Sequence, residues 1–239
     1  MPVITLEELI RAGFHFGHRT SRWNPKMKPY IFGRHNLIHI INLRETLRGL
    51  ITAHKFLTKL SGSGKDVLFV GTKWQARNTV TREARRAGMH FVTERWLGGT
   101  LTNFNTISLR IKHLKELEEL LAGEDANQYS KKIISSLNRE ARKLKKNLDG
   151  MRNMTELPGA VIIVDPNREI TAVKEANKLG IPTICLTDTD CDPDLVDICI
   201  PGNDDAMRSI EVFLTKMTDA VLNGKPSEPV VSHQEVGQP

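Results

Sequence analysis

Val67-Leu68-Phe69-Val70-Gly71, an apolar run closed by a glycine, is the stretch that decides the fold class, and Ala160-Val161-Ile162-Ile163-Val164 repeats its pattern. A strand without polar positions is buried on both faces, which is typical of a parallel sheet between helices. Helical patterns alternate with these runs, so we expect an α/β fold. The five expected strands are 37–41, 67–70, 160–164, 183–187 and 197–200, and Phe91-Val92 adds a fragment of a sixth.

Residues 102–155 interrupt this alternation. Ile134, Leu137, Ala141, Leu144 and Leu148 step by three and four, which is the spacing of a coiled-coil seam. We therefore expect an inserted antiparallel helical hairpin whose outward charges are solvated. The predicted organisation is an α/β body over 1–101 and 156–224 with a basic N-terminal arm over 1–36, a hairpin over 102–155 and a disordered tail over 225–239.

The charge is distributed unevenly along the chain. Its 239 residues include 34 Lys plus Arg and 28 Asp plus Glu, but residues 1–113 carry net +13 and residues 156–239 net −9. Such a gradient predicts one face for a polyanion, of which nucleic acid is the commonest. No apolar run is long enough to span a bilayer, the start lacks the layout of a secretory signal, and the three cysteines form no Cys-x-x-Cys. We expect a cytoplasmic protein that binds neither membrane nor DNA.

The motifs of a nucleotide-binding enzyme are absent from the sequence. After the strand 67–70 the turn Gly71-Thr72-Lys73-Trp74-Gln75-Ala76 lacks the second and third glycines of a dinucleotide fingerprint. Ser61-Gly62-Ser63-Gly64-Lys65-Asp66 precedes a strand where a phosphate loop would follow one. No nucleophile motif is present. We therefore expect no enzyme and no cofactor.

Two groups of residues raise the question of a metal ion. The aspartates 188, 190 and 192 imitate a calcium loop, but Pro193 and Cys199 stand where Gly and Glu are needed. His15 and His18, or His35 and His39, have the spacing of metal pairs. We expect no metal and interpret the acidic cluster as a solvated rim, while a cation at Asp188, Asp190, Asp204 and Asp205 or at the histidines stays an open alternative.

The segment 13–36 combines cations and aromatic residues and has no acidic residue. Its prolines and glycines shape a chain that can follow an RNA backbone and stack on bases. We expect Phe14, Phe16 and Phe32 to pack onto the body instead. A second candidate, 94–104, contains Gly98-Gly99, and its alternative is a hinge into the hairpin. The predicted RNA-binding residues are Arg19, Arg22, Trp23, Asn24, Lys26, Lys28, Tyr30, Arg34, Lys73, Arg95, Trp96 and Asn103.

Several motifs resemble the bacterial small-subunit ribosomal protein S2 family over about residues 5–224. They are Phe16-Gly17-His18, Trp23-Asn24-Pro25-Lys26-Met27-Lys28-Pro29, His39-Ile40-Ile41-Asn42-Leu43, Leu68-Phe69-Val70-Gly71-Thr72-Lys73, Arg95-Trp96-Leu97-Gly98-Gly99, Lys174-Glu175-Ala176-Asn177, Asp192-Pro193-Asp194 and Ile200-Pro201-Gly202-Asn203-Asp204-Asp205-Ala206.

This resemblance implies a flavodoxin-like three-layer body with a protruding helical hairpin and no catalytic activity. It also implies a place between head and body of the small subunit, contact with small-subunit ribosomal RNA and neighbouring proteins, and help in recruiting ribosomal protein one for translation initiation. The alternatives are a nucleotide-dependent enzyme on the same fold and a free regulator that binds messenger RNA.

Overall fold

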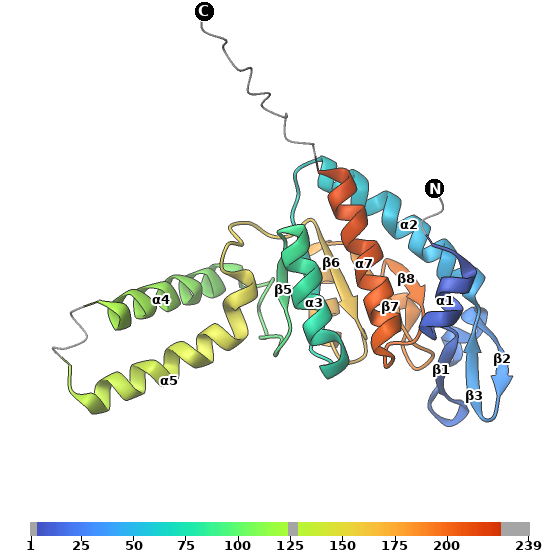
Figure 1. Cartoon of the computed structure of the whole chain (residues 1–239), viewed down its shortest axis with the longest axis horizontal. Coiled ribbons are helices and arrows are strands. Elements are labelled where there is room, and N and C mark those ends of the chain that lie inside the picture. The colour runs from blue at the N-terminus through green and yellow to red at the C-terminus, as the bar shows by residue number, and fades with distance from the viewer. Residues whose placement is uncertain (1–3, 124–128, 226–239) are drawn as a thin grey trace, which may run out of the picture.

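The computed structural model describes residues 4–123 and 129–225 (Figure 1). Most of the connection expected between the two hairpin helices, and the expected tail beyond Lys225, lie outside the described residues. Each described helix is too short or too polar to cross a bilayer.

A five-stranded parallel sheet forms the centre of the body, in the order β5-β4-β6-β7-β8. Numbered along the chain this is 2-1-3-4-5, the flavodoxin-like order. The strands β4, β6 and β7 are buried at every position, which is why their sequences are almost wholly apolar. The strands are β4 Val67–Val70, β5 His90–Val92, β6 Ala160–Val164, β7 Thr183–Thr187 and β8 Ile198–Pro201.

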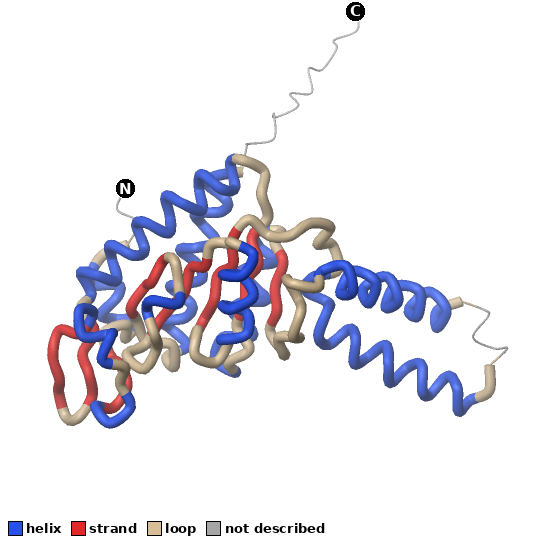
Figure 2. Tube along the Cα trace, turned by 180° about the vertical axis from the view of Figure 1, so that it is seen from behind, coloured by secondary structure: helices blue, strands red, loops and turns tan. Residues whose placement is uncertain are grey.

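Helices cover both faces of this sheet, so the expected three-layer architecture is confirmed. On one face α2 (Leu43–Gly62), α3 (Trp74–Ala87) and α7 (Met207–Gly224) pack into a core that includes Leu50, Phe69 and Phe213 (Figure 1). On the other face α6 (Ile170–Leu179) and the root of the hairpin enclose a second core (Figure 2). A short helix α1 (Leu6–Ala12) packs on α7 and begins with the expected capping box of Thr5 and Glu8.

A helical hairpin projects from one end of the body (Figures 1 and 2). Its helices are α4 (Phe104–Ala122) and α5 (Lys131–Leu148), and the short 3-10 helix η4 (Asp149–Met151) returns the chain to the sheet. Between the helices, Leu114, Leu117 and Ala141 form a small core of their own. The pattern at every third or fourth residue therefore packs helix against helix, as the sequence predicts.

The predicted strand 37–41 does not belong to the parallel sheet. β3 (Ile38–Ile41) instead pairs antiparallel with β1 (Phe16–Arg19) and β2 (Ile31–His35) in a separate sheet of order β1-β3-β2. The left-handed residues Asn36 and Leu37, with φ of 47° and 62°, make the tight turn that folds β3 back on β2. The fifth parallel strand is β5, which the sequence indicates only as a fragment.

Candidate RNA-binding surface

Residues 13–41, which overlap the N-terminal arm 1–36 predicted from the sequence and are called the arm from here on, lie along the carboxyl ends of β7 and β8. The backbone N–H of His18 donates to Thr189 Oγ1 at 2.9 Å, and the N–H of Asn24 donates to the Thr189 carbonyl at 2.8 Å. At the next strand end, the N–H of Asn203 donates to the carbonyl of Phe14 at 3.2 Å. The arm is thus bound to the two loops that follow these strands.

Close packing accompanies these hydrogen bonds. A Cβ on Gly17 would lie 2.6 Å from Thr189 Cγ2, so only glycine allows the arm this approach. Phe14 is fully buried under Gly202, which confirms that this ring packs into the body. Met27, in the 3-10 helix η2 (Pro25–Tyr30), is also fully buried. The arm therefore has a fixed position on the sheet edge.

Ion pairs connect the basic arm to the acidic loop after β7. Lys26 Nζ lies 2.8 Å from Asp192 Oδ2 and 2.9 Å from Asp194 Oδ2, and hydrogen bonds to these carboxylates raise the pKa of Lys26 to about 12. His18 Nδ1 lies 3.0 Å from Asp188 Oδ2, and this hydrogen bond raises the pKa of His18 to about 9. Part of the acidic last third of the chain therefore neutralises the arm, so Lys26, a predicted RNA ligand, is an anchor.

Lys73 is another predicted RNA ligand that faces the interior. Its side chain is 11% exposed, and Nζ lies 2.7 Å from Asp204 Oδ1, 2.5 Å from Asp205 Oδ1 and 3.6 Å from Asp165 Oδ2. Burial and the neighbouring carboxylates of Asp165 and Asp188 raise the pKa of Asp204. Lys73 is thus committed to balancing buried acids, and the structure does not present it to RNA.

Lys73 also fills the place where a nucleotide would bind on this fold. Ligands of open α/β sheets bind at the carboxyl edge where the strand order reverses, which here is between β4 and β6. Lys73 follows β4, and Asp165 follows β6 directly. Their ion pair occupies this switch point, which removes the structural basis for a nucleotide-dependent enzyme.

Trp96 is buried as well, because Glu175 of α6 holds the segment 96–102 in place. The indole Nε1 donates to Glu175 Oε1 at 3.1 Å, and the backbone N–H groups of Gly99 and Leu101 donate to the same carboxylate at 2.8 and 3.0 Å. Burial would raise the pKa of Glu175, but the hydrogen bonds from Gly99, Trp96 and Leu101 outweigh it and lower the pKa. Trp96 therefore cannot stack on a base, and the segment is better described as a fixed turn into α4.

Four predicted cations remain exposed on the arm and form no ion pair within residues 4–123 and 129–225. They are Arg19 at the end of β1, Arg22 in the 3-10 helix η1 (Thr20–Arg22), Lys28 in η2 and Arg34 in β2. Because the acidic loop binds Lys26 and His18, these four charges stay available. They are the part of the predicted site that the structure leaves open to a polyanion.

The other predicted residues of the arm are half-buried. Trp23 stacks at a tilt against His39, with ring centroids 5.1 Å apart, and Asn24 caps η2 by accepting from the N–H of Lys26 at 3.0 Å. Tyr30 accepts a backbone hydrogen bond from Asn42. These residues shape the arm more than they extend from it, whereas Arg95 and Asn103 are exposed on the turn into α4.

Phe32 does not pack onto the body as the sequence predicts, and its exposure makes it a candidate RNA contact that the sequence did not indicate. Its side chain is 80% exposed on the edge strand β2, and Leu37 at the hairpin tip is 71% exposed, so neither packs onto the body. Phe16 is also exposed, at 47%. A signal for Phe32 exists in its neighbours Gly33 and Arg34, because an aromatic ring two residues from an arginine on a strand suits stacking beside a phosphate contact.

Two sets of side chains have the donors of a metal site. His18, Asp188 and Asp204 bring ligand atoms within 4.8 Å of one another, as do Asp165, Cys191 and Asp204. Their described contacts are explained by the ion pairs with His18 and Lys73. The expectation that no metal binds here stays a prediction.

Comparison with known proteins agrees with the fold. The sequence profile of the family described as Ribosomal protein S2 matches residues 9–224. The small ribosomal subunit protein uS2 of Rhodopirellula baltica is 57% identical over 220 residues, which cover 92% of this chain and 85% of that protein. The protein of the same name from Syntrophobacter fumaroxidans is 53% identical over 225 residues, covering 94% and 82%. This chain therefore belongs to the ribosomal protein S2 family, a non-enzymatic family of the small ribosomal subunit.

Proposed function

We propose that this protein binds small-subunit ribosomal RNA through the arm, with Arg19, Arg22, Lys28 and Arg34 contacting phosphates. The observation that carries the proposal is that these cations are exposed and unpaired among the described residues, on a segment whose other charges are neutralised. Each phosphate that a cation neutralises releases counterions, which contributes affinity.

The anchoring of the arm supports this assignment. Hydrogen bonds to Thr189 and the buried side chains of Phe14 and Met27 hold the arm in place before any RNA arrives. A preorganised surface loses less conformational entropy on binding than a flexible tail does. Phe32 then adds a ring that stacks on an unpaired base next to the phosphate contact of Arg34.

Membership of the family places the chain in the cytoplasm as a ribonucleoprotein component, with ribosomal RNA and other ribosomal proteins as its partners. Our proposal extends this to a position between head and body of the small subunit and to support for the recruitment of ribosomal protein one. The free messenger-RNA regulator is the second candidate. Co-sedimentation separates the two, because a ribosomal component migrates with small subunits through a sucrose gradient at moderate salt.

The test removes the four charges as Arg19→Gln, Arg22→Gln, Lys28→Gln and Arg34→Gln. Binding to small subunits that lack this protein is measured from low to high salt. With about 0.7–0.9 of slope per phosphate, the plot of log affinity against log salt should flatten by about 3. The matched control removes four exposed cations of α2: Arg44, Arg48, Lys55 and Lys59. Equal slopes for both variants would show that the arm is not the contact.

A further inference from the structure

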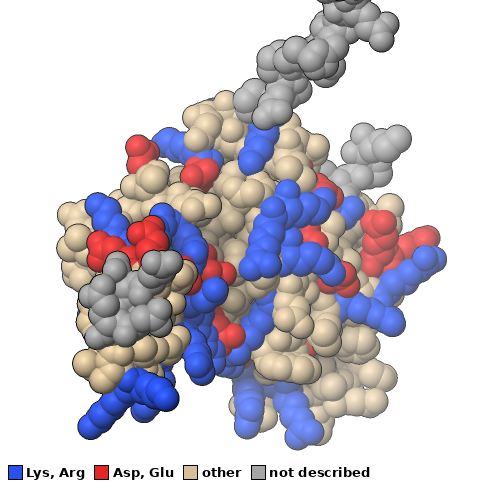
Figure 3. All heavy atoms as spheres, turned by 60° about the vertical axis from the view of Figure 1, so that its left-hand side comes forward, with Lys and Arg blue, Asp and Glu red and all other residues tan. Residues whose placement is uncertain are grey.

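The hairpin has an excess of positive charge that lies almost entirely on α5. This helix carries one acid, Glu140, whereas α4 balances three cations with three acids. Figure 3, in which the hairpin comes forward, shows Lys and Arg side chains gathered on this side of the molecule. The cations of α5 are Lys131, Lys132, Arg139, Arg142, Lys143, Lys145 and Lys146.

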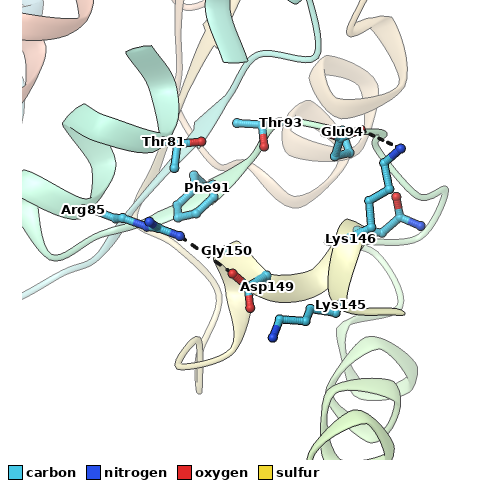
Figure 4. Close-up of a pocket in the computed structure, with 10 residues that line it drawn as sticks. Thr81, Arg85, Phe91, Thr93, Glu94, Lys145, Lys146, Asp149 and Gly150 are labelled. Carbon is cyan, nitrogen blue, oxygen red and sulfur yellow. Dashed lines mark ion pairs between the residues drawn. The ribbon is translucent and has the colours of Figure 1, made fainter. Parts of the chain in front are cut away.

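The acids near the root of the hairpin neutralise only the cations closest to the body. Glu118 pairs with Arg152 and with Lys145 at 3.5 Å. Lys146 Nζ lies 3.3 Å from Glu94 Oε2, and Arg85 lies 3.8 Å from Asp149, across a pocket of about 270 Å³ (Figure 4). The cations that line this root pocket outnumber its acids, but each of them is already held in an ion pair within the protein.

Farther out, a second hollow has the opposite balance. Arg110 of α4 and Arg139 and Lys143 of α5 line a groove of about 520 Å³ together with Ser136, Leu144 and Glu140. All three cations are exposed, and none forms an ion pair among the described residues. Glu140, the one acid of the groove, contacts His113 instead of these cations, with Oε1 3.4 Å from His113 Nε2. Three cations from two helices thus surround one hollow.

We propose that this groove and its three cations bind neighbouring phosphates of the RNA backbone, which makes the hairpin a second RNA-binding element separate from the arm. Arginine presents a planar fork that binds phosphate with two parallel hydrogen bonds, and Ser136 adds a hydroxyl donor. The inference depends on the proposed function only for the identity of the polyanion, since the family supplies ribosomal RNA as the commonest anion nearby.

The arginines of α3 show that basic helices of this protein do not all have free charge. Arg82 pairs with Glu211 at 2.7 Å and Arg86 with Asp219 at 2.8 Å, so α7 neutralises that face. The number of basic residues on a helix therefore does not by itself show how much of their charge is free of acidic partners. The hairpin groove combines a hollow with three cations that lack acidic partners among residues 4–123 and 129–225, and one acid lines it. The hollow between α1 and α7 also has such cations, Arg11, Arg208 and Lys216, but two acids, Glu8 and Glu211, line it with them.

The root of the hairpin holds the groove at a fixed place relative to the body. A Cβ on Gly150 would overlap the carbonyl oxygen of Phe91 in β5, so the return of the chain is packed directly against the sheet edge. Leu148 and Met151 are buried in the core beneath it. A rigid root lets the groove and the arm engage the same RNA without loss of effective concentration.

The test compares Arg110→Gln/Arg139→Gln/Lys143→Gln with a control that removes three exposed α2 cations, Arg44→Gln/Lys55→Gln/Lys59→Gln. Glutamine keeps a high helix propensity, so circular dichroism and the melting temperature should stay at wild-type values. In salt titrations on small subunits lacking this protein, the groove variant should lose about 2–3 of slope and roughly 100-fold of affinity at 0.1 M salt. The α2 control should stay within about threefold of wild type.

A benzophenone side chain placed at Ser136 identifies what lies in the groove of reconstituted subunits. A cross-link to ribosomal RNA supports the proposal, whereas a cross-link to protein alone, or none, overturns it. An unchanged salt slope for the groove variant also overturns it. If the arm variant loses slope and the groove variant does not, the proposed function stands and only the second site fails.

Discussion

Replacement of Glu175 by glutamine tests whether one carboxylate organises the turn from the body into the hairpin. Oε1 accepts from Trp96 Nε1 and the Gly99 N–H, and Oε2 accepts from the N–H groups of Leu101 and Thr102. In Glu175→Gln one oxygen becomes an amide nitrogen, which is itself a donor. Two N–H groups then lose their acceptor, whichever way the amide turns.

The cost follows from these counts. Hydrogen bonds to a charged group contribute about 1.5–3 kcal/mol each, so the loss of two predicts a destabilisation of about 3–6 kcal/mol. Urea unfolding of the isolated protein, followed by circular dichroism, measures this difference. Glu116→Gln is the control, because Glu116 is exposed on α4 and should change stability by about 0.5 kcal/mol or less.

The pH dependence adds an independent check. The pKa of Glu175 is lowered in the folded protein, so its contribution to stability is present above the unfolded pKa of about 4.3 and is lost as the pH falls through the folded value. The difference between wild type and Glu175→Gln should therefore be constant from pH 7 to about pH 5 and shrink below about pH 4. A difference under about 1 kcal/mol at pH 7 would refute this account of the turn.

Two further predictions concern the arm. Asp188 raises the pKa of His18 to about 9, so the stability that His18 contributes is fully present below its unfolded pKa of about 6.5 and is lost as the pH rises through about 9. In hydrogen exchange of the arm amides, the difference between His18→Gln and wild type should therefore shrink over this range. A difference that stays constant would contradict the ion pair. Phe32→Ala should leave the urea midpoint unchanged, because the ring is 80% exposed. If the ring stacks on a base, the same substitution should weaken subunit binding by about 1–3 kcal/mol. Leu222→Ala, which removes an exposed apolar side chain of α7, is the control.

The buried sheet could be predicted because burial on both faces leaves a local record. β4 and β6 are apolar at every position, and runs of four or five apolar residues are typical of strands buried on both faces. The hairpin seam and the capping box of Thr5 are local signals too. Structural elements that are determined by residues close together in sequence can therefore be predicted without a structure.

The small antiparallel sheet could not be predicted from a local sequence pattern. Its pairing is irregular, with register shifts between Phe16 and Arg19 and between Ile31 and Gly33, so the strands do not alternate cleanly between polar and apolar residues. Ile38–Ile41 has the composition of a buried strand because it is the centre of that sheet. Its apolar run alone could not show which sheet it joins.

Whether a predicted site residue is accessible to RNA in this structure depends on partners far away in sequence. Lys26 pairs with Asp192, Lys73 with Asp204 and Trp96 with Glu175, and each pair is separated by more than seventy residues. A sequence pattern shows that a cation is present but not whether a distant acid neutralises it. Arg19, Arg22, Lys28 and Arg34 remain candidates because the fold brings no acid within ion-pair distance of them among the described residues.

The arrangement gives a structural role to acidic residues in the last third of the chain. Asp188, Asp192 and Asp194 lie at the sheet edge, where open carboxylates would repel an RNA backbone. The arm pairs these three acids with His18 and Lys26, so part of their charge is neutralised within the protein while the outer cations face solvent. If the arm binds RNA as proposed, a variant that releases it should weaken binding for two reasons: the four cations are displaced, and the acids that paired with His18 and Lys26 become free to repel the RNA backbone.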